Sequence, residues 1–440
     1  MTKPTYIIGV LDNGVAGLSA VALQQLHQAD VIIGACRTLL LFKNEFKKTT
    51  RQYDIAEGLS KVPVWITQAQ NDNLNIVVLA TGDPMCHGIG RYLMNKLEEK
   101  SCKVIPNVST LQLAFARLGL AWQDAEICSV HSKDAGEWTG DAGAEHGLYP
   151  VLEAVRCHHL IAIFTSPENS PQRIARMLIN VGLGETFNMS VAEALLSDQE
   201  NVIRNLSLHK AAKHNFVNPN IVILQRQIES PITLFGLADE SFVQRKPDKG
   251  LITKREVRAV SLARLQLRID SIVWDIGAGS GAVGLEAARL CSKGYVYAIE
   301  KNEADVVIAR TNCKQMVVTN YRVQHGKAPD LLSDWADPDA VFFGGSGGEL
   351  AELIKLCLSR LKENGWLVMN FVTLENLALA TAVLQELKIE WDVTQLQASR
   401  SQPILHMHRM KAENPVWIVC AQQNRNNECN YSACLDFASD

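Results

Sequence analysis

The stretch V-W-D-I-G-A-G-S-G at residues 273–281 decides the fold of the second half of this chain. Val273–Ile276 has the apolar pattern of a short buried strand, and a helical pattern follows at residues 282–290. The glycines between them permit a tight turn and a close approach of a ligand to the backbone, while the helix start presents free N–H groups. This strand–turn–helix unit predicts an α/β domain with a ligand site at the loop.

The same alternation of short apolar runs and longer helical stretches extends outward from this loop. In the second half we expect a helix at Thr253–Leu267 and strands at Ile272–Ile276, Tyr295–Glu300, Arg322–His325, Ala340–Phe343 and Trp366–Phe371. In the first half we expect strands at Tyr6–Val10, Val31–Gly34, Ile76–Ala80, Leu160–Phe164 and Ile221–Leu224. Repeated strand–helix units imply, for the second half, a parallel sheet with helices on both faces.

The length of the chain predicts two domains. It has 440 residues, and single cores stop growing at roughly 250 to 300 residues. The regular pattern breaks between Arg226 and Gly250, where Pro231 and Pro247 interrupt it. We therefore place the first domain at 1–228 and the second at 229–423, and we expect a flexible tail at 424–440.

Composition excludes several classes of protein. With 47% hydrophobic and 20% charged residues the chain should be globular, and its net charge of −4 argues against nucleic acid as a partner. No apolar run approaches the roughly 18 to 20 residues of a membrane span, so we expect a cytoplasmic protein. Eleven scattered cysteines form no C-x-x-C pair, and His406-x-His408 lacks a third ligand, so we expect no metal site.

Glu300 adds a second signal to the glycine loop. It ends the next predicted strand, where an acid can accept hydrogen bonds from both hydroxyls of a ribose, although a solvated strand end is the plain alternative. D-I-G-A-G-S-G followed by this acid resembles the S-adenosylmethionine site of Rossmann-like methyltransferases. A dinucleotide dehydrogenase is disfavoured, because its G-x-G-x-x-G fingerprint would need glycine at Ala282.

The loop after the fourth strand of the second domain limits the class of methyl acceptor that we expect. Methyltransferases that act on exocyclic amines usually carry an N/D-P-P-Y/F tetrad there, whereas this chain has F-G-G-S-G-G at residues 343–348. An amine acceptor is therefore disfavoured, and so is an RNA methyltransferase. The glycine run suggests a site without side chains on one side, which leaves space for a bulky, flat substrate. A plain flexible loop is the alternative.

In the first half, T-G-D-P-M-C-H-G-I-G at residues 81–90 follows a predicted strand. By itself it could be an ordinary strand–turn–helix junction. Together with Y-I-I-G-V-L-D-N-G-V-A-G-L-S at 6–19 and V-I-P-N-V-S-T-L-Q-L-A at 104–114, it resembles the tetrapyrrole methylase family, and within it the branch that acts on precorrin-6 in cobalamin synthesis. The resemblance implies that this domain is a methyltransferase as well.

The second half resembles the partner methyltransferase of the same step. The matching segments are G-L-I-T-K-R-E-V-R at 250–258, the glycine loop, G-K-A-P at 326–329 and G-G-S-G-G at 344–348. The combined resemblance implies a tetrapyrrole methylase domain followed by a Rossmann-like methyltransferase domain. It further implies S-adenosylmethionine-dependent methylation of a corrinoid precursor, precorrin-6, at carbons 5 and 15, with decarboxylation of an acetate side chain. We also expect a homo-oligomer.

The resemblance also implies which residues bind the ligands, with no metal and no assigned catalytic residue. The expected cofactor contacts are Gly82, Asp83, Pro84, Ser109 and Thr110 in the first domain, and Thr253, Asp275, Gly277, Ala278, Gly279, Ser280, Gly281, Glu300 and Ala328 in the second. The expected cations for substrate carboxylates are Lys254, Arg255, Arg258, Arg400 and Arg409, with a solvated basic face as the alternative for each arginine. Thr253-x-x-Glu256 also reads as a helix capping box.

Four positions, at three sites, depart from the family pattern. Leu11 stands where the family's first loop has its middle glycine, so a Cβ there could strain the turn or block a ligand. Lys327 replaces an acid near the expected adenine site, with a salt bridge elsewhere as the plain explanation. Cys86 and His87 replace an aromatic pair and are interpreted as packing or rim residues. Leu11 motivates an alternative function, in which only the second domain is an active methyltransferase and the first is a binding or docking module.

Overall fold

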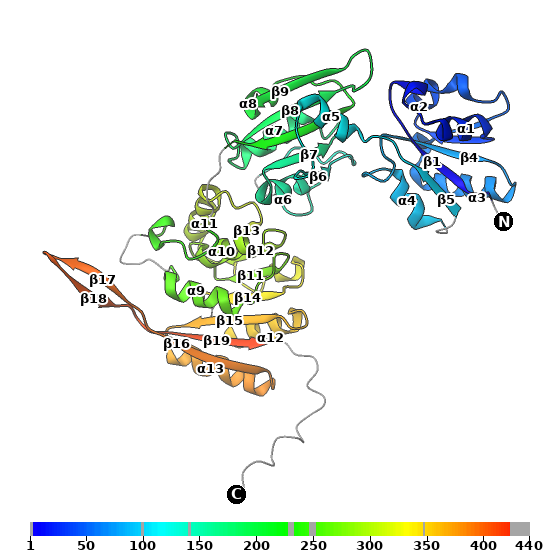
Figure 1. Ribbon diagram of the computed structural model, residues 1–440. Coiled ribbons are helices and arrows are strands. Elements are labelled where there is room, and N and C mark those ends of the chain that lie inside the picture. The colour runs from blue at the N-terminus through cyan, green and yellow to red at the C-terminus, as the bar shows by residue number, and fades with distance from the viewer. Residues whose placement is uncertain are drawn as a thin grey trace, which may run out of the picture. The chain divides into compact units, whose positions relative to one another are not determined.

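The computed structural model describes residues 3–97, 101–139, 142–227, 233–245, 252–345 and 348–422, shown as ribbons in Figure 1. The chain forms two compact units, one of residues 1–138 and 150–228 and the other of residues 139–149 and 229–440. The expected tail at 424–440 and the expected boundary at 228/229 lie outside the described residues. No helix in the described ranges is long and apolar enough to cross a membrane.

The first unit begins with a parallel five-stranded sheet in the order β3-β2-β4-β1-β5. Its strands are β1 Thr5–Val10, β2 Val31–Gly34, β3 Arg51–Asp54, β4 Ile76–Thr81 and β5 Cys102–Ile105. Because side chains alternate along β1, Ile8 joins a core with α1 (Ala20–Gln28) and α2 (Cys36–Leu41), while Ile7 joins a core with α3 (Val62–Asn71) and α4 (Ile89–Lys96). Helices therefore cover both faces.

The second sheet of this unit is mixed and has the order β6-β7-β10-β8-β9. Its strands are β6 Glu126–Ser129, β7 Leu160–Phe164, β8 Phe187–Glu193, β9 Asn201–Ser207 and β10 Asn220–Arg226, and its helices are α5 Thr110–Leu118, α6 Tyr149–Cys157, α7 Pro171–Asn180 and α8 Leu208–Ala211. In this unit β3, β5 and β6 were not predicted, and neither were β8 and β9. Polar residues interrupt both runs, and β9 is a largely exposed edge strand without a continuous apolar pattern.

The second unit is built on a seven-stranded sheet in the order β13-β12-β11-β14-β15-β19-β16. The strands are β11 Ile272–Ile276, β12 Tyr295–Glu300, β13 Tyr321–His325, β14 Ala340–Phe343, β15 Trp366–Phe371, β16 Glu390–Leu396 and β19 Val416–Gln422. The five predicted strands are confirmed to within one residue. These five strands pair in parallel, as predicted, whereas β16 and β19 were not predicted, and β19 pairs antiparallel with both β15 and β16.

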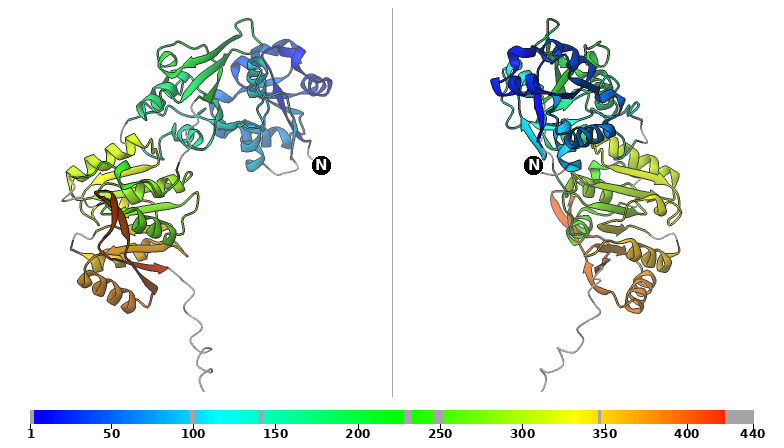
Figure 2. Two further views of the ribbon diagram at one scale, coloured as in Figure 1. Left: turned by 60° about the vertical axis from the view of Figure 1, so that its left-hand side comes forward. Right: turned by 90° about the vertical axis from the view of Figure 1, so that its right-hand side faces the viewer.

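Helices lie on both faces of this sheet (Figures 1 and 2). Val273 joins a core with α9 (Arg255–Arg264), α10 (Ala282–Leu290) and α11 (Glu303–Gln315). Its neighbour Trp274 joins the core on the other face, with α12 (Leu350–Arg360) and α13 (Leu374–Glu386). Since β11 pairs with β12 on one side and β14 on the other, the loops that follow these strands diverge at this point, which is where open α/β sheets bind ligands.

A separate hairpin, β17 (Ser399–Ile404) and β18 (Met407–Ala412), projects from the sheet of the second unit (Figure 1). Its tip is open to solvent, and Leu405 is 92% exposed. His408 lies in β18 and His406 in the turn before it, and both are exposed. Within the described ranges, no group of three or more His, Cys, Asp or Glu side chains could hold a metal ion.

Arg258 is a fully buried charge of the second unit, with an exposed fraction of 0%. Its guanidinium donates to Glu286 over 2.8 Å and to Asp239 over 3.2 Å, and both carboxylates are also buried. It also donates to the carbonyl of Leu237 and lies 4.8 Å from the ring centroid of Phe242. The expectation that Arg258 binds substrate at a pocket mouth is therefore wrong: it ties residues 237–242 to α9 and α10.

The expected capping box at Thr253 and Glu256 is also wrong. Helix α9 begins at Arg255, and its cap residue Lys254 makes no side-chain capping hydrogen bond. Glu256 instead accepts hydrogen bonds from Arg400, which also donates to Asp239 over 2.7 Å. Arg400 holds the base of the hairpin to α9 and has two carboxylate partners, so the structure gives it a structural pairing in place of the expected substrate contact.

We predict that Arg258→Met lowers the free energy of unfolding by about 3 to 5 kcal/mol, because it leaves the Glu286 carboxylate buried without a cation and leaves Asp239 with Arg400 alone. Urea unfolding measures the change. The matched control is Lys355→Met, whose exposed pair with Glu352 should contribute less than about 1 kcal/mol. Equal stability of the two variants would contradict the prediction.

Candidate functional site

The glycine loop between β11 and α10 is shaped by three left-handed residues. Gly277, Gly279 and Gly281 have φ angles of +74°, +54° and +78°, which L side chains rarely adopt. A Cβ on Gly277 would also lie 2.6 Å from the carbonyl oxygen of Gly345, in the loop after β14. Glycine is therefore required both by the turn and by the close approach of the two loops.

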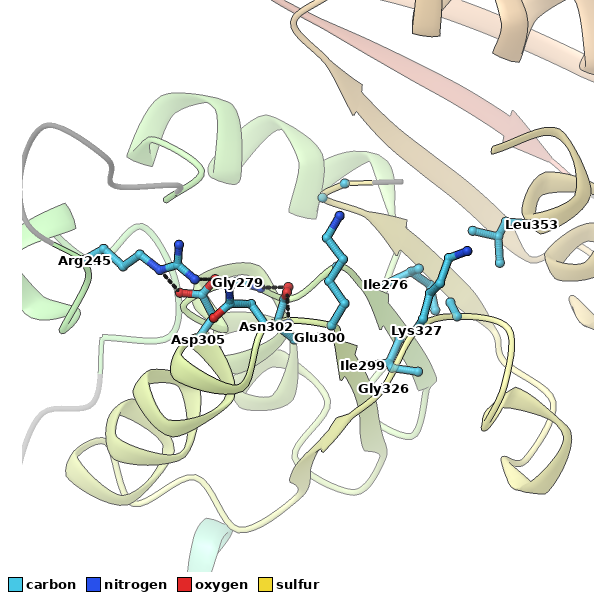
Figure 3. Close-up of a pocket in the computed structure, with 15 residues that line it drawn as sticks. Arg245, Ile276, Gly279, Ile299, Glu300, Asn302, Asp305, Gly326, Lys327 and Leu353 are labelled. Carbon is cyan, nitrogen blue, oxygen red and sulfur yellow. Dashed lines mark hydrogen bonds and ion pairs between the residues drawn. The ribbon is translucent and has the colours of Figure 1, made fainter. Parts of the chain in front are cut away.

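A cavity of about 390 Å³ opens beside this loop (Figure 3). It is lined by residues at the carboxyl ends of β11, β12, β13 and β14, with additional residues from α11 and α12. The lining residues are Arg245, Ile276, Gly277, Gly279, Ile299, Glu300, Lys301, Asn302, Asp305, Gly326, Lys327, Ala328, Gly344, Gly345 and Leu353. Its place at the divergence of the strands is the one that the sheet topology predicts for a ligand.

Glu300 is fixed at the edge of this cavity, and its exposed fraction is 8%. One carboxylate oxygen accepts the N–H of Gly279 over 2.9 Å, and the other accepts the N–H of Asn302 over 2.9 Å (Figure 3). Because each carboxylate oxygen has two acceptor positions, both can still accept a hydroxyl from a ligand. The carboxylate thus shapes the glycine loop and remains suited to a diol.

Asp275 lies beneath the loop and does not line the cavity. Its exposed fraction is 1%, and neither carboxylate oxygen has a hydrogen-bond partner among the described residues. Burial raises the pKa of Asp275 from 3.8 to about 7; the nearby N–H of Gly284 opposes this shift, and the charge of Glu300 adds to it. The hydroxyl of Tyr321 is a second buried group without a partner, and burial raises its pKa well above 10.0. A Cβ on Gly284 would lie 2.4 Å from Asp275 and 2.6 Å from Tyr321, so both side chains meet at that glycine.

We predict that Asp275→Asn stabilises the protein at pH 8 but not at pH 4. Between pH 3.8 and about 7 the unfolded chain releases a proton that the folded protein keeps, so the Asp275 carboxyl lowers the free energy of unfolding progressively over this window. The full effect above pH 7 is up to about 4 kcal/mol. Urea unfolding of the wild type and Asp275→Asn across this pH range measures the difference in free energy of unfolding. Asp330→Asn, at an exposed position, is the control. A difference that does not grow with pH would contradict the prediction.

The structure brings together only part of the predicted cofactor set of the second domain. Gly277, Gly279, Glu300 and Ala328 line the cavity. The remaining loop residues Ala278, Ser280 and Gly281 shape the turn without lining the cavity, and Thr253 is outside it, where its carbonyl accepts a hydrogen bond from Arg258.

The predicted substrate cations are not gathered at this cavity. Lys254, Arg255 and Arg409 are not among its lining residues. Arg255 is exposed and donates to the carbonyl of Leu237, while Arg409 is exposed on the hairpin and donates to Gln402. Ser346 and Gly347 of the predicted glycine floor, and Gly250 and Leu251 of the motif before α9, lie outside the described residues.

Several lining residues were missed by the sequence analysis. Asn302 caps α11 through its side chain, and an Asn directly after a strand-ending acid is a signal that could have been used. Arg245, which pairs with Asp305 over 2.7 Å, comes from the irregular stretch before α9, and Leu353 comes from α12. No local pattern places these residues at the cavity, because only the tertiary fold brings them there.

Lys327 forms an ion pair with Glu349 over 2.9 Å, which confirms the salt bridge considered for it. Both side chains are about half exposed, so the pair contributes little to stability. It joins the loop after β13 to the start of α12. The lysine therefore takes part in the wall of the cavity as one half of a neutral pair.

The first unit brings its five predicted cofactor residues together at the carboxyl ends of β1, β4 and β5. A Cβ on Gly82, whose φ is +72°, would lie 3.2 Å from the N–H nitrogen of Thr110 and 3.5 Å from Cα of Ser109. Asp83 accepts the N–H of Met85 over 2.9 Å and so fixes the turn that contains Pro84. Ser109 caps α5 in a capping box with Gln112. The two loops thus form one rigid cluster.

Leu11 does not strain the loop after β1. Its φ is not in the left-handed region, and its side chain is 6% exposed within the core. The turn is closed by the N–H of Gly14, which donates to the carbonyl of Leu11 over 3.0 Å, and Gly14 supplies the left-handed φ of +63°. The expectation of a strained turn is therefore wrong, and leucine at this position is a packing residue.

Comparison with known proteins agrees with this division into two folds. Residues 5–208 match the model for tetrapyrrole (corrin/porphyrin) methylases, and residues 246–422 match the model for the precorrin methyltransferase domain. A cobalt-precorrin-6B C(15)-methyltransferase (decarboxylating) of Salmonella typhimurium is 38% identical over 177 residues, which cover 40% of this chain and 91% of that protein. The chain belongs to the decarboxylating precorrin methyltransferases.

Members of this family also match the chain over nearly its whole length. A precorrin-6Y C(5,15)-methyltransferase [decarboxylating] of Sinorhizobium sp is 29% identical over 414 residues, covering 93% of this chain and 94% of that protein. A solved structure of a precorrin-6Y C5,15-methyltransferase from Geobacter metallireducens GS-15 is 38% identical, covers 43% of this chain and 100% of that one, and has a TM-score of 0.42. The predicted fold class, a tetrapyrrole methylase domain followed by a Rossmann-like methyltransferase domain, is confirmed, and the chain is a methyltransferase.

Proposed function

We propose that the chain transfers two methyl groups from S-adenosylmethionine to carbons 5 and 15 of a precorrin-6 macrocycle and releases one acetate carboxyl as carbon dioxide. The observation that carries the proposal is the presence, in one chain, of two separate strand-end clusters, at Gly82–Thr110 and at Gly277–Glu300, on two different methyltransferase folds. The relatives that match both halves are named for both methylations and for decarboxylation.

The residues of the second domain fit S-adenosylmethionine. Gly277 and Gly279 have no side chains, so a ligand can approach the backbone at the cavity. The Glu300 carboxylate can accept hydrogen bonds from the two ribose hydroxyls. Ile299, Ala328 and Leu353 supply apolar surface for a planar ring. In the first domain, we propose that Gly82, Asp83, Pro84, Ser109 and Thr110 hold a second molecule of the same cofactor.

The cofactor supplies an electrophilic methyl group on a sulfonium, and the macrocycle supplies an electron-rich carbon. The protein then contributes mainly alignment, which is worth roughly 7 to 11 kcal/mol in favourable intramolecular reactions. The rigid loops fit this role, because Glu300 and the left-handed glycines fix one site and the Ser109 capping box fixes the other. Asp275 supports the loop from below and is too deeply buried to reach a substrate.

The partners follow from the same proposal. Lys254, Arg255 and Arg409 remain candidates for the substrate carboxylates of the second domain. The predicted homo-oligomer also remains a proposal, supported by the exposed apolar side chains of Leu405, Met407 and Met410 on the hairpin. The alternative is that the first domain only binds or docks. That alternative was based on a strained turn at Leu11, and Leu11 does not have a left-handed φ.

We predict that Glu300→Ala weakens S-adenosylmethionine binding about tenfold to a hundredfold, because a charged hydrogen-bond acceptor is lost. Titration calorimetry on the full chain measures the effect. Glu303→Ala, an exposed position three residues later and outside the cavity, is the matched control and should bind as the wild type does. Unchanged affinity in a folded Glu300→Ala variant would remove Glu300 from the site.

We also predict that the two methylations separate in the intact chain. At a cofactor concentration near the wild-type dissociation constant, Glu300→Ala should lose the carbon 15 methyl and carbon dioxide together, because decarboxylation alters the electron density that the neighbouring methylation uses. Gly82→Val places a side chain at a buried, left-handed position and should lose only the carbon 5 methyl. Product mass and release of labelled carbon dioxide are the readouts. Loss of carbon dioxide release in Gly82→Val would refute this division.

A further inference from the structure

A second cavity lies in the first unit beside helix α4, whose place is labelled in Figure 1. Its volume is about 560 Å³, within the range of roughly 300 to 1,000 Å³ that is usual for small-molecule sites. We call it the α4 cavity. Its lining residues are Met85, Cys86, His87, Gly88, Arg91, Tyr92, Asn95 and Ile127.

The lining chemistry is that of a site for an anion. Arg91 carries the one permanent charge among these eight residues, and none of them is an acid. Arg91 and Asn95 are one helical turn apart, and Tyr92 is three residues from Asn95, so all three lie along one side of α4. Their guanidinium, hydroxyl and amide groups can all donate hydrogen bonds into the cavity.

The guanidinium of Arg91 is exposed and makes no hydrogen bond or ion pair with any described residue. Other arginines of the same unit have carboxylate partners: Arg37 pairs with Asp12 over 2.9 Å, and Arg117 pairs with Glu200 over 2.5 Å. The planar fork of an arginine matches a carboxylate in a bidentate geometry. Arg91 thus has no partner among the described residues, no acid among the eight lining residues and further donors beside it, so it is suited to a carboxylate ligand.

His87 is held in place before any ligand arrives. Its φ of +53° is rare for a residue with a bulky side chain, and its ring lies 5.6 Å from that of Phe164. Two turn hydrogen bonds fix the loop around it, Cys86 N–H to Asp83 over 3.1 Å and Gly90 N–H to Pro84 over 3.0 Å. Such conformations persist where the surrounding structure over-determines them, and they cluster at binding sites.

The α4 cavity and the proposed cofactor site share one loop. Residues 82–84 are the candidate cofactor contacts, and residues 85–88 line the cavity. A ligand anchored at Arg91 therefore lies next to the methyl donor of the first domain. We propose that the α4 cavity receives a carboxylate side chain of the macrocycle, with Arg91 as its bidentate partner and Tyr92, Asn95 and His87 as further donors. This inference rests on the proposed function, because it takes the macrocycle as the ligand.

The test is the steady-state kinetics of methyl transfer to carbon 5 of precorrin-6 by the full chain, with the product position assigned by nuclear magnetic resonance. Arg91→Gln should raise KM for the macrocycle about tenfold to a hundredfold and leave kcat close to that of the wild type. Cofactor affinity and methyl transfer to carbon 15 should not change, and Arg91→Lys should recover part of the loss. Arg51→Gln removes another exposed arginine of the same unit, outside the cavity, and is the matched control.

Three outcomes would overturn the inference. In the first, Arg91→Gln has the same KM as Arg51→Gln. In the second, succinate competes in the wild type but not in Arg91→Gln while KM for the macrocycle is unchanged, which would assign the cavity to a free dicarboxylate. In the third, Arg91→Gln loses cofactor affinity to the same degree as KM, which would make Arg91 a structural residue. Absence of any methyl transfer by the wild type would instead refute the proposed function itself.

Discussion

The buried guanidinium of Arg258 is the constraint on which the second unit depends. Two buried carboxylates, Asp239 and Glu286, accept its hydrogen bonds, so loss of the guanidinium would leave Glu286 buried without a cation at a large desolvation cost. Glu286 also accepts the N–H groups of Gly236 and Leu237, and Asp239 also accepts from Arg400. One cluster therefore fixes residues 236–239, helices α9 and α10, and the base of the hairpin.

This cluster affects the ligand site because it holds α10 in position. Glu286 lies on that helix one turn after its glycine-rich start, so the arginine helps to set the position of the helix that begins at the cavity. The irregular stretch that contains residues 236–239 also contains Arg245, which lines the cavity and pairs with Asp305 of α11. A stretch without regular periodicity in the sequence is in this way part of the wall of the site.

The sequence allowed the strands and the glycine loops to be predicted, because both depend on local patterns. Buried strands such as β11 and β12 are apolar runs except for Asp275 and Glu300 near their ends, and the loop at 277–281 needs glycine for its left-handed turns. The edge strands β9 and β16 were missed because exposed strands have no such run, but β19 was also missed, although V-W-I-V-C-A-Q is a largely buried apolar run. Arg258 and Arg400 were misassigned for a related reason: a sequence does not show whether an arginine points to solvent or to a buried acid. Leu353 and Arg245 reach the cavity only through tertiary packing.

The close approach between the loops after β11 and β14 has a consequence for interpreting related sequences. A side chain at Gly277 would collide with the backbone of Gly345 whether or not a cofactor is bound, whereas Gly345 itself has nothing within 4 Å of its would-be Cβ. Selection on folding alone therefore retains glycine at 277. A descendant that had abandoned catalysis would still keep that part of the motif, while residue 345 would be free to drift. Glycine at 345 is thus the more informative mark of a lineage that still uses its pocket.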